Sequence, residues 1–287
     1  MKVAVFGQFG WYGTMGTWVA DGFEMNGHEV ERIDRKDIIL LPEKYDLIMH
    51  VDCSEDYSSH VTKCKGGVRA FWSMDTHMPG GIERSVNIAK KCDIVFSSNY
   101  EAGVKTLEKF GVESYLMPVT YNDRLLAKPH KNLDIDIAMI GHENSPERKE
   151  LFKILNDNYK CFTGKADTEQ EYVNIMNSCK MVVNQPTEPW DMILNNRLFE
   201  GMGFNKLVLQ KRLRTDLIEK LGFVVNEDFV YWENFDDLND KIKTLLDIYK
   251  VRNMMAERGN DKVQSYAMSV QCAKIESIIL SKFYDRF

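Results

Sequence analysis

The segment "VAVFGQFGWYGTMGTWVADGFEMNG", residues 3–27, shows the pattern that decides the fold. Its first apolar run, Val3–Phe6, has the length and composition of a buried strand. A glycine-rich loop follows, and apolar residues then recur at helical spacing through Trp18 and Phe23 until Asn26-Gly27 ends the pattern. A strand that leads directly into a helix is the repeating unit of a parallel sheet covered by helices.

The same alternation continues along the chain with one interruption. Strand-like runs occur at Glu29–Ile33, Leu47–Val51, Val68–Trp72, Ile94–Ser97 and Ser114–Met117, and again at Ile135–Ile140, Tyr159–Thr163, Met181–Asn184 and Leu207–Leu209. Helical patterns fill the gaps between these runs. Residues 117–134 interrupt the alternation with prolines and many polar residues, which is typical of a linker. The sequence therefore predicts two consecutive α/β units.

We place the boundaries of these units by the same pattern. An N-terminal Rossmann-like unit is predicted over residues 1–122, a linker over 123–133, a C-terminal Rossmann-like unit over 134–260 and a tail over 261–287. Apolar residues at roughly helical spacing predict that the tail is one long helix. Its apolar stripe needs a partner surface, either the first unit or a second copy of the chain.

Composition places the chain among soluble globular proteins. Hydrophobic residues make up 44% and charged residues 28% of its 287 residues. No apolar run approaches the roughly 20 residues of a membrane span, and the N-terminus lacks the features of a signal peptide. The six cysteines contain no CxxC pair, which favours reduced thiols over disulfides or a zinc cluster. The net charge of −6 gives no overall reason to bind nucleic acid, although it is compatible with a local basic groove. We therefore predict a cytoplasmic protein.

Four glycines recur at every third position in the loop after the first strand. A dinucleotide fingerprint needs a closer G-x-G pair, which this loop lacks, although an acidic residue, Asp34, does follow the second strand. Close packing of the next helix against the sheet is a second explanation. We favour a third: Gly10 and Gly13 let the backbone approach a ligand, and Trp11 or Tyr12 faces that ligand. Ligands of open α/β sheets bind beyond the carboxyl ends of the strands.

A more specific pattern lies in "NNRLFEGMGFNKLVLQ", residues 195–210. The sequence Asn196-Arg197-Leu198-Phe199-Glu200 leads through a turn of small residues into a buried strand, Leu207–Leu209. It resembles the donor-site motif of GT-B glycosyltransferases, in particular the spore-maturation-protein-like (CgeB-like) group of the glycosyltransferase-1/4 clan. Similarity extends over nearly the whole chain, including "DIDIAMIGHENSPERKELF" (134–152) and "CFTGKA" (161–166), but only residues 197–200 are specific.

The resemblance implies a fold, an activity and a donor. The fold is GT-B, with two Rossmann-like domains facing a central cleft and a last helix that crosses back onto the first domain. The activity is that of a hexosyl- or pentosyltransferase that uses a nucleotide-diphosphate sugar, a UDP-sugar, as co-substrate. No resident cofactor and no bound metal are expected in such an enzyme.

The chemistry of a nucleotide-sugar donor agrees with the position of this motif. Glu200 can accept hydrogen bonds from both ribose hydroxyls. Arg197, Lys165 and a helix N-terminus can balance the charge of the diphosphate. The alternatives are an exposed i,i+3 ion pair for Arg197 and Glu200, and a solvated turn for Lys165. The donor-binding candidates are Lys165, Asn196, Arg197, Glu200, Gly141 and His142.

One departure from the family concerns catalysis. Retaining members carry a second acidic residue at the position that Met192 occupies here, beside Asp191, so the stereochemistry stays open. An inverting enzyme needs a base in the first unit to deprotonate the acceptor hydroxyl. The segment "SMDTHMPGG" supplies Asp75 as our first choice and His77 as the second. The alternative for Asp75 is a cap on the turn that follows it.

The acceptor is not specified by the sequence. A small molecule, a cell-surface glycan, a lipid-linked sugar and a modified nucleobase all stay open. The chain is rich in Lys, Met and Asn and has seven prolines, a composition similar to that of phage proteins. Phage enzymes of this class glycosylate hydroxymethylated DNA bases, so DNA in the host cytoplasm is one hypothesis for the acceptor. A nucleotide-sugar epimerase of the same fold and a non-catalytic nucleotide-binding or assembly protein are the alternatives, and the oligomeric state stays open.

Overall fold

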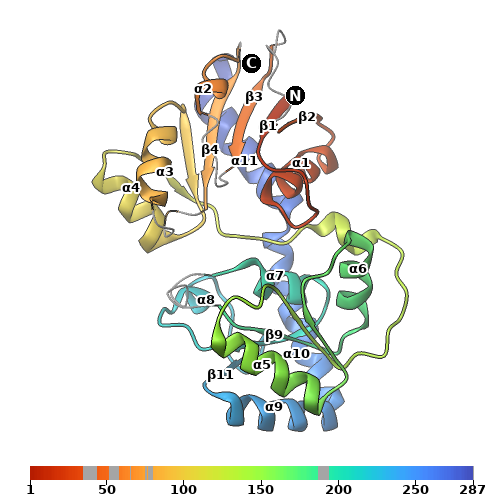
Figure 1. Cartoon of the computed structure of the whole chain (residues 1–287). Coiled ribbons are helices and arrows are strands. Elements are labelled where there is room, and N and C mark those ends of the chain that lie inside the picture. Colours follow the sequence, from red (N-terminus) through yellow and green to blue (C-terminus); the bar gives the residue numbers. More distant parts are fainter. Residues whose placement is uncertain are drawn as a thin grey trace. The chain divides into compact units, whose positions relative to one another are not determined.

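The computed structural model describes residues 1–34, 44–51, 58–64, 66–74, 76, 80–186 and 194–286. The chain divides into two units, one formed by Met1–Arg124 together with Met268–Phe287 and the other by Leu125–Ala267. Each unit contains one parallel sheet with helices packed against it (Figure 1). The predicted fold class, α/β with two parallel sheets, is therefore confirmed.

The sheet of the first unit has the strand order β2-β1-β3-β4-β5-β6. Its strands are β1 (Lys2–Phe6), β2 (Glu29–Ile33), β3 (Leu47–Val51), β4 (Val68–Ser73), β5 (Ile94–Ser97) and β6 (Tyr115–Leu116). The helices are α1 (Met15–Met25), α2 (Ser58–Val61), α3 (Gly81–Ala89), the π-helix η2 (Tyr100–Val104), α4 (Lys105–Lys109), α11 (Met268–Phe283) and the 3-10 turn η6 (Tyr284–Arg286).

Both faces of this first sheet are buried. Val3 and Val5 of β1 face a core formed with α1 and α11, whereas Ala4 and Phe6 face the opposite side, where Val61 of α2 packs. Successive side chains of a strand point to opposite faces, so a strand covered on both sides is apolar throughout. This explains why "VAVF" is a continuous apolar run rather than an alternating one.

The sheet of the second unit has the order β11-β10-β9-β7-β8. Its strands are β7 (Ile137–Ile140), β8 (Cys161–Gly164), β9 (Met181–Asn184), β10 (Leu207–Lys211) and β11 (Val230–Trp232). The helices are η3 (Asp123–Ala127), which spans the unit boundary, α5 (Pro146–Asn158), α6 (Glu169–Ser178), α7 (Asn196–Gly203), α8 (Leu217–Lys220), α9 (Phe235–Asp247), α10 (Tyr249–Val263) and η5 (Gln264–Tyr266).

One face of this second sheet packs against α5, α9 and α10. Helix α7 lies close to β9 and β10, and Gly201 makes this approach possible. A Cβ at Gly201 would lie 2.5 Å from Cγ2 of Val208 and 3.3 Å from Cβ of Val182. The predicted turn, Gly201–Gly203, therefore lies inside the helix, where Gly201 sets the distance of the helix from the sheet.

The tail differs from the prediction of one long helix over residues 261–287. Helix α10 ends at Val263, the 3-10 turn η5 follows, and α11 begins at Met268 after an extended residue, Ala267. The two parts have different partners, because Val263 belongs to the second unit whereas Cys272 packs in the core of the first. The apolar residues of the tail thus divide between the two units, and the helix breaks where one unit ends and the other begins.

The expected linker is ordered along α6. The backbone N–H of Lys131 donates to Oδ1 of Asn174 at 2.9 Å, and that of Leu133 donates to Oγ of Ser178 at 2.8 Å. These side-chain bonds replace the backbone partners that an extended segment lacks. Residues 128–133 are thus part of the second unit rather than a free connector.

Candidate functional site

The carboxyl ends of the strands in the second sheet form a topological switch point. From β7 the chain passes through α5 to β8 on one side, whereas β9 leads through α7 to β10 and β11 on the other. Open α/β sheets bind ligands where connections leave neighbouring strands in opposite directions. In this unit that position lies between the end of β7, followed by Gly141, and the end of β9, followed by Gln185.

Helix α7 starts at this switch point and is held there by buried amides. Oδ1 of its N-cap, Asn195, accepts a hydrogen bond from the backbone N–H of Arg197 at 3.2 Å. Asn184 at the end of β9 donates to the same Oδ1 at 2.8 Å, and it also donates to Oε1 of Gln210 at 2.7 Å. These bonds fix the N-terminus of α7, where backbone N–H groups and the helix dipole favour an anion.

Arg197 and Glu200 form an ion pair on the first turns of α7. Arg197 also donates from Nε to the backbone oxygen of Ile140, the last residue of β7, at 3.2 Å. The side chain of Glu200 is only 3% exposed. The pair is therefore not the exposed ion pair that was the alternative for this spacing, because its carboxylate is buried and its guanidinium contacts β7.

Arg148 is a residue that sequence reasoning did not select as part of the site. It is buried on α5 and donates from Nη1 to the backbone oxygen of Gln185 at 2.7 Å. Burial, and then the nearby Arg197 guanidinium, lower the pKa of Arg148. Gly141 has φ of 151°, and a Cβ there would lie 2.5 Å from Nη2 of Arg148. Two guanidinium groups thus lie beside the switch point, which suits an anionic ligand such as a diphosphate.

Gly141, His142 and Lys165 lie together at the ends of β7 and β8. They line a surface hollow of about 460 Å³, to which α5 contributes Lys149 and Lys153. The structure therefore groups the donor candidates as two neighbouring sets along one sheet edge: these three, and the α7 residues Asn196, Arg197 and Glu200.

The glycine-rich loop of the first unit contains glycines of two kinds. A Cβ at Gly7 would lie 3.0 Å from Cα of Gly16, so these two allow close packing of the loop against the start of α1. At Gly10, in contrast, a Cβ would have no atom within 4 Å. The rings of Trp11 and Tyr12 lie 4.8 Å apart and are half-buried. The packing explanation therefore applies to the outer glycines, and Gly10 is open to solvent.

Gly13 lies under the ring of Trp11. A Cβ at Gly13 would come within 2.4 Å of that ring. Because a side chain here would displace the indole, Gly13 sets the position of Trp11 rather than offering open backbone to a ligand.

The two predicted catalytic residues, Asp75 and His77, lie outside the described residues. Thr76, the described residue between them, is buried, as are Ser98 and Asn99 after β5. Nδ2 of Asn99, two residues past the end of β5, donates to Oγ of Ser98 at 3.1 Å. Oδ1 of Asn99 and Oγ1 of Thr76 are buried and have no hydrogen-bond partner among the described residues. Sequence reasoning did not select Thr76 or Asn99, and the signal for Asn99 was the polar run Ser97–Asn99 at a strand end.

Comparison with known proteins adds a family model and solved structures. The family model described as "Glycosyl transferase-like" matches residues 124–274. Anabaena Alr3699/HepE in complex with UDP-glucose is similar, with 12% identity, a TM-score of 0.69 and coverage of 98% of this chain and 100% of that chain. A search of curated proteins found no match.

Two further solved structures show the same similarity. Sucrose-phosphate synthase from Thermosynechococcus elongatus has 10% identity and a TM-score of 0.63, over 99% of this chain and 100% of that chain. A glycosyltransferase from Rickettsia africae has 14% identity and a TM-score of 0.64, over 98% and 97%. At these identities the likeness establishes the fold, which is that of GT-B glycosyltransferases.

Two absences concern the described part of the chain. No helix within it has both the length and the apolar character needed to cross a bilayer. No group of three or more His, Cys, Asp or Glu residues within it is arranged to hold a metal ion.

Proposed function

This chain belongs to the glycosyl transferase-like family, and we propose that it transfers a sugar from a UDP-sugar to a hydroxyl group of an acceptor. The observation that carries the proposal is the buried Glu200–Arg197 pair, bound to the end of β7 at the N-terminus of α7. UDP is supported as the nucleotide because HepE, which shares the fold, has been solved with UDP and with UDP-glucose.

In the proposed complex, the residues at the edge of the second sheet divide the donor between them. The Glu200 carboxylate accepts hydrogen bonds from the two ribose hydroxyls. Arg197, Lys165 and the α7 N-terminus bind the diphosphate, and Arg148 adds a second guanidinium that its bond to Gln185 holds in place. Gly141 and His142 line the edge of this site.

In the proposed reaction, an acceptor oxygen attacks the anomeric carbon of the sugar. The bond between that carbon and the diphosphate oxygen breaks, and its electron pair leaves with UDP. Cationic groups fixed before the reaction stabilise the charge that develops on the leaving group. The acceptor proton passes to a base, for which Asp75 is our first choice and His77 the second. The site uses no resident cofactor or metal in this scheme.

Within the first unit we assign the acceptor to the side of Gly10, Trp11, Tyr12 and Gly13. A hydroxymethylated base of phage DNA is one acceptor class that we propose to test, together with saccharides, and we place the reaction in the cytoplasm. A nucleotide-sugar epimerase and a non-catalytic binding or assembly protein are the competing functions.

A donor panel tests the proposal. Wild type, Glu200→Ala and a control, Glu150→Ala on the exposed face of α5, are mixed with a set of nucleotide sugars. Thermal shift reports binding, and chromatography reports the products. We expect a UDP-sugar to stabilise wild type and the control but not Glu200→Ala, and to be hydrolysed slowly to UDP and free sugar. An epimerised sugar would instead indicate an epimerase, and absence of any shift across the panel would contradict both enzymatic functions.

A further inference from the structure

The glycine-rich loop and the first turns of α1 form a stretch of the first unit without charge. From Val3 to Ala20 the sequence contains no Asp, Glu, Lys, Arg or His. The loop lies at the carboxyl end of β1, where open α/β sheets bind their ligands. A loop that cradles a phosphate combines backbone N–H groups with a lysine, which this stretch lacks. Its chemistry therefore suits an uncharged ligand.

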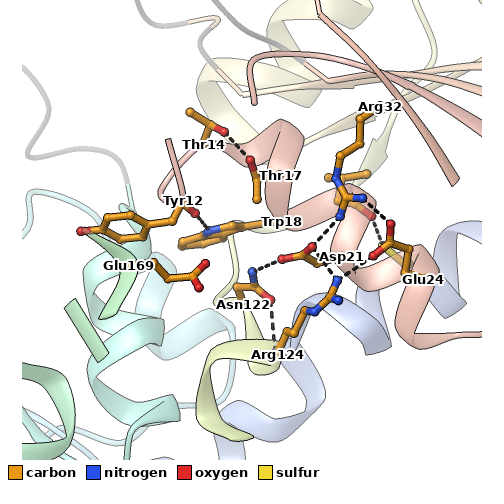
Figure 2. Close-up of polar contacts among 12 residues, drawn as sticks. Tyr12, Thr14, Thr17, Trp18, Asp21, Glu24, Arg32, Asn122, Arg124 and Glu169 are labelled. Atoms are coloured by element: carbon orange, nitrogen blue, oxygen red, sulfur yellow. Dashed lines mark hydrogen bonds and ion pairs between the residues drawn. The ribbon is translucent and has the colours of Figure 1, made fainter. Parts of the chain in front are cut away.

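Side chains at the start of α1 hold the loop in one shape (Figure 2). Oγ1 of Thr14 lies 2.9 Å from the backbone oxygen of Trp11 and 2.9 Å from Oγ1 of Thr17. Nε1 of Trp18 donates to the backbone oxygen of Tyr12 at 2.7 Å. The backbone oxygens of Trp11 and Tyr12 are thus bound within the loop, and both side chains are positioned before any ligand arrives. Such preorganisation lowers the entropic cost of binding.

The surface that this loop presents is aromatic. The half-buried rings of Trp11 and Tyr12 lie 4.8 Å apart, and a Cβ at the preceding Gly10 would have no atom within 4 Å. A sugar ring carries C–H groups on its faces, which pack against aromatic rings, and hydroxyl groups at its rim, which need hydrogen bonds. Gly10 leaves room for such a ring to approach the loop.

The ends of β4 and β5 add neutral polar groups to the same edge of the sheet. Oγ of Ser73 lies 3.0 Å from Oγ of Ser85, and Oγ of Ser98 accepts a hydrogen bond from Nδ2 of Asn99 at 3.1 Å. Oδ1 of Asn99 is buried and has no hydrogen-bond partner among the described residues. Because Oδ1 is an acceptor, its missing partner is a donor. A saccharide hydroxyl can donate to it, whereas an ionised phosphodiester has only acceptor oxygens.

Two arginines beside α1 are already paired with carboxylates, as Figure 2 shows. Asp21 is 6% exposed and accepts hydrogen bonds from Arg32 at 2.7 Å and from Arg124 at 2.9 Å. Glu24, one turn later on α1, binds the same two guanidinium groups. The formal charges of these four side chains sum to zero. This cluster therefore offers no net positive charge to DNA, whose binding depends on Lys and Arg that neutralise phosphates.

The distance between the aromatic rings and Asn99 sets a minimum length for the ligand. In the sheet, β3 and β4 lie between β1 and β5. Neighbouring strands are about 4.8 Å apart, so the ends of β1 and β5 are separated by roughly 14 Å. This span is longer than one sugar ring. A ligand that contacts both ends is therefore an oligosaccharide.

We propose that the acceptor is an uncharged oligosaccharide that packs on Trp11 and Tyr12 and donates a hydroxyl hydrogen bond to Asn99. This inference rests on the proposed function, because it takes the first unit as the acceptor side. The bond changes are those of the proposed reaction, with one saccharide hydroxyl as the group that attacks the anomeric carbon. DNA and other anionic acceptors are the alternatives that the experiment distinguishes.

An acceptor panel tests this substrate class. Wild type receives the UDP-sugar that the donor panel identifies, together with neutral mono- and oligosaccharides, saccharides that carry carboxylate, sulfate or phosphate groups, and duplex DNA with hydroxymethylated cytosine. UDP release above the rate of donor hydrolysis, and the mass of the acceptor, report transfer. We expect transfer to a neutral oligosaccharide, with a KM that is the same at roughly 50 and 200 mM salt. Ligands held by phosphate contacts weaken by orders of magnitude over that range.

Variants of the first unit test the assigned residues. Tyr12→Ala and Asn99→Ala are each expected to raise the KM for the oligosaccharide about tenfold and to leave donor hydrolysis unchanged. If one of them does not fold, the other carries the test. Tyr249→Ala, which removes a tyrosine of α10 that is 55% exposed, is the matched control. Arg84→Gln, which removes a cation from the first turn of α3, is expected to leave the KM unchanged.

Three results would overturn the inference and leave the donor site intact. They are transfer to DNA or to charged saccharides alone, donor hydrolysis without transfer to any saccharide, and a raised KM with unchanged donor hydrolysis in Arg84→Gln. An unchanged KM in both Tyr12→Ala and Asn99→Ala would remove these residues from the acceptor site. Absence of binding to any UDP-sugar would overturn the proposed function, and this inference with it.

Discussion

The carboxyl edges of the two sheets differ in how their buried polar groups are paired. In the second unit, Asn184, Asn195 and Gln210 bind one another and hold the start of α7. In the first unit, Asn99 donates to its neighbour Ser98. Buried polar atoms without a hydrogen-bond partner among the described residues occur at both edges: Oδ1 of Asn99 and Oγ1 of Thr76 at the first, and Oε1 of Gln185 and Nε of Arg148 at the second. The family model likewise covers residues 124–274, the second unit and the start of α11.

This difference indicates separate roles for the two edges. A fully paired network holds one geometry, which suits a donor whose diphosphate and ribose are the same in every member of a class. A buried polar group without a partner costs about 1–3 kcal/mol, and a ligand that supplies the partner recovers part of this cost. Because such groups occur at both edges, the proposed division, with the donor at the second edge and the acceptor at the first, rests on the amide network at the start of α7 and not on unpaired groups.

The largest expected effect is that of Glu200→Gln on donor binding. The amide keeps the volume of the carboxylate but loses its charge and one acceptor, so the affinity for UDP falls by roughly tenfold to a hundredfold, equivalent to about 1.5–3 kcal/mol. Isothermal titration calorimetry measures this change. Asn99→Ala on the other edge is the control and retains wild-type affinity for UDP. Equal affinities of wild type and Glu200→Gln for UDP would contradict the proposal that the Glu200 carboxylate binds the ribose hydroxyls.

A smaller effect is expected for Arg148→Met. The substitution removes a guanidinium from the proposed diphosphate site and weakens UDP binding by about tenfold, since a charged hydrogen bond contributes roughly 1.5 kcal/mol. Stability also falls, by about 1–3 kcal/mol, because the substitution removes the hydrogen bond from Nη1 to the buried backbone oxygen of Gln185. UDP titration and urea unfolding are measured on the same preparations, with Lys250→Met, at an exposed position of α10 outside the donor site, as the control. A large loss of stability with unchanged UDP affinity would make Arg148 a structural residue only.

Trp11→Ala tests the first edge. The indole packs over Gly13 in the loop to which we assign the acceptor, so we expect its loss to lower the rate of sugar transfer while the affinity for UDP stays at the wild-type level. Transfer kinetics with the acceptor found in the panel, together with UDP titration, separate the two effects. If the affinity for UDP falls and the rate of transfer to the acceptor does not, the glycine-rich loop binds the nucleotide instead.

The smallest expected effect is that of metal removal. Arg197, Arg148, Lys165 and the α7 N-terminus supply positive charge for the diphosphate, so we expect EDTA to leave UDP affinity and donor hydrolysis unchanged. The measurement compares both quantities with EDTA and with added Mg²⁺. A loss of hydrolysis in EDTA that Mg²⁺ restores would show that the cationic groups at the carboxyl edge of the second sheet do not stabilise the leaving UDP without a metal ion.

Much of the fold follows from local pattern, and the exceptions have physical causes. Strands such as Leu47–Val51 and Met181–Asn184 are buried on both faces, so their apolar runs define them without tertiary information. The break at Ala267 was missed, because the apolar residues on both sides keep helical spacing. Only the membership of two separate units shows that the two parts pack against different partners.

The candidate site was predictable where a motif identifies it. Arg197 and Glu200 come from one short segment that resembles a family, and both lie at the switch point. Arg148 was missed because its pattern is that of a core residue: it shares one face of α5 with the buried Leu151, Phe152 and Leu155. A charged residue on an apolar stripe was the available signal, because charged side chains are rarely fully buried unless they are paired.

The central claim, that the nucleotide binds at the edge of the second sheet, is tested most directly by a crystal structure of the protein with UDP. We predict that the ribose lies within hydrogen-bond distance of the Glu200 carboxylate and that the diphosphate lies at the N-terminus of α7 beside Arg197. UDP bound instead at the glycine-rich loop, against Gly10 and Gly13, would contradict the division of roles between the two edges.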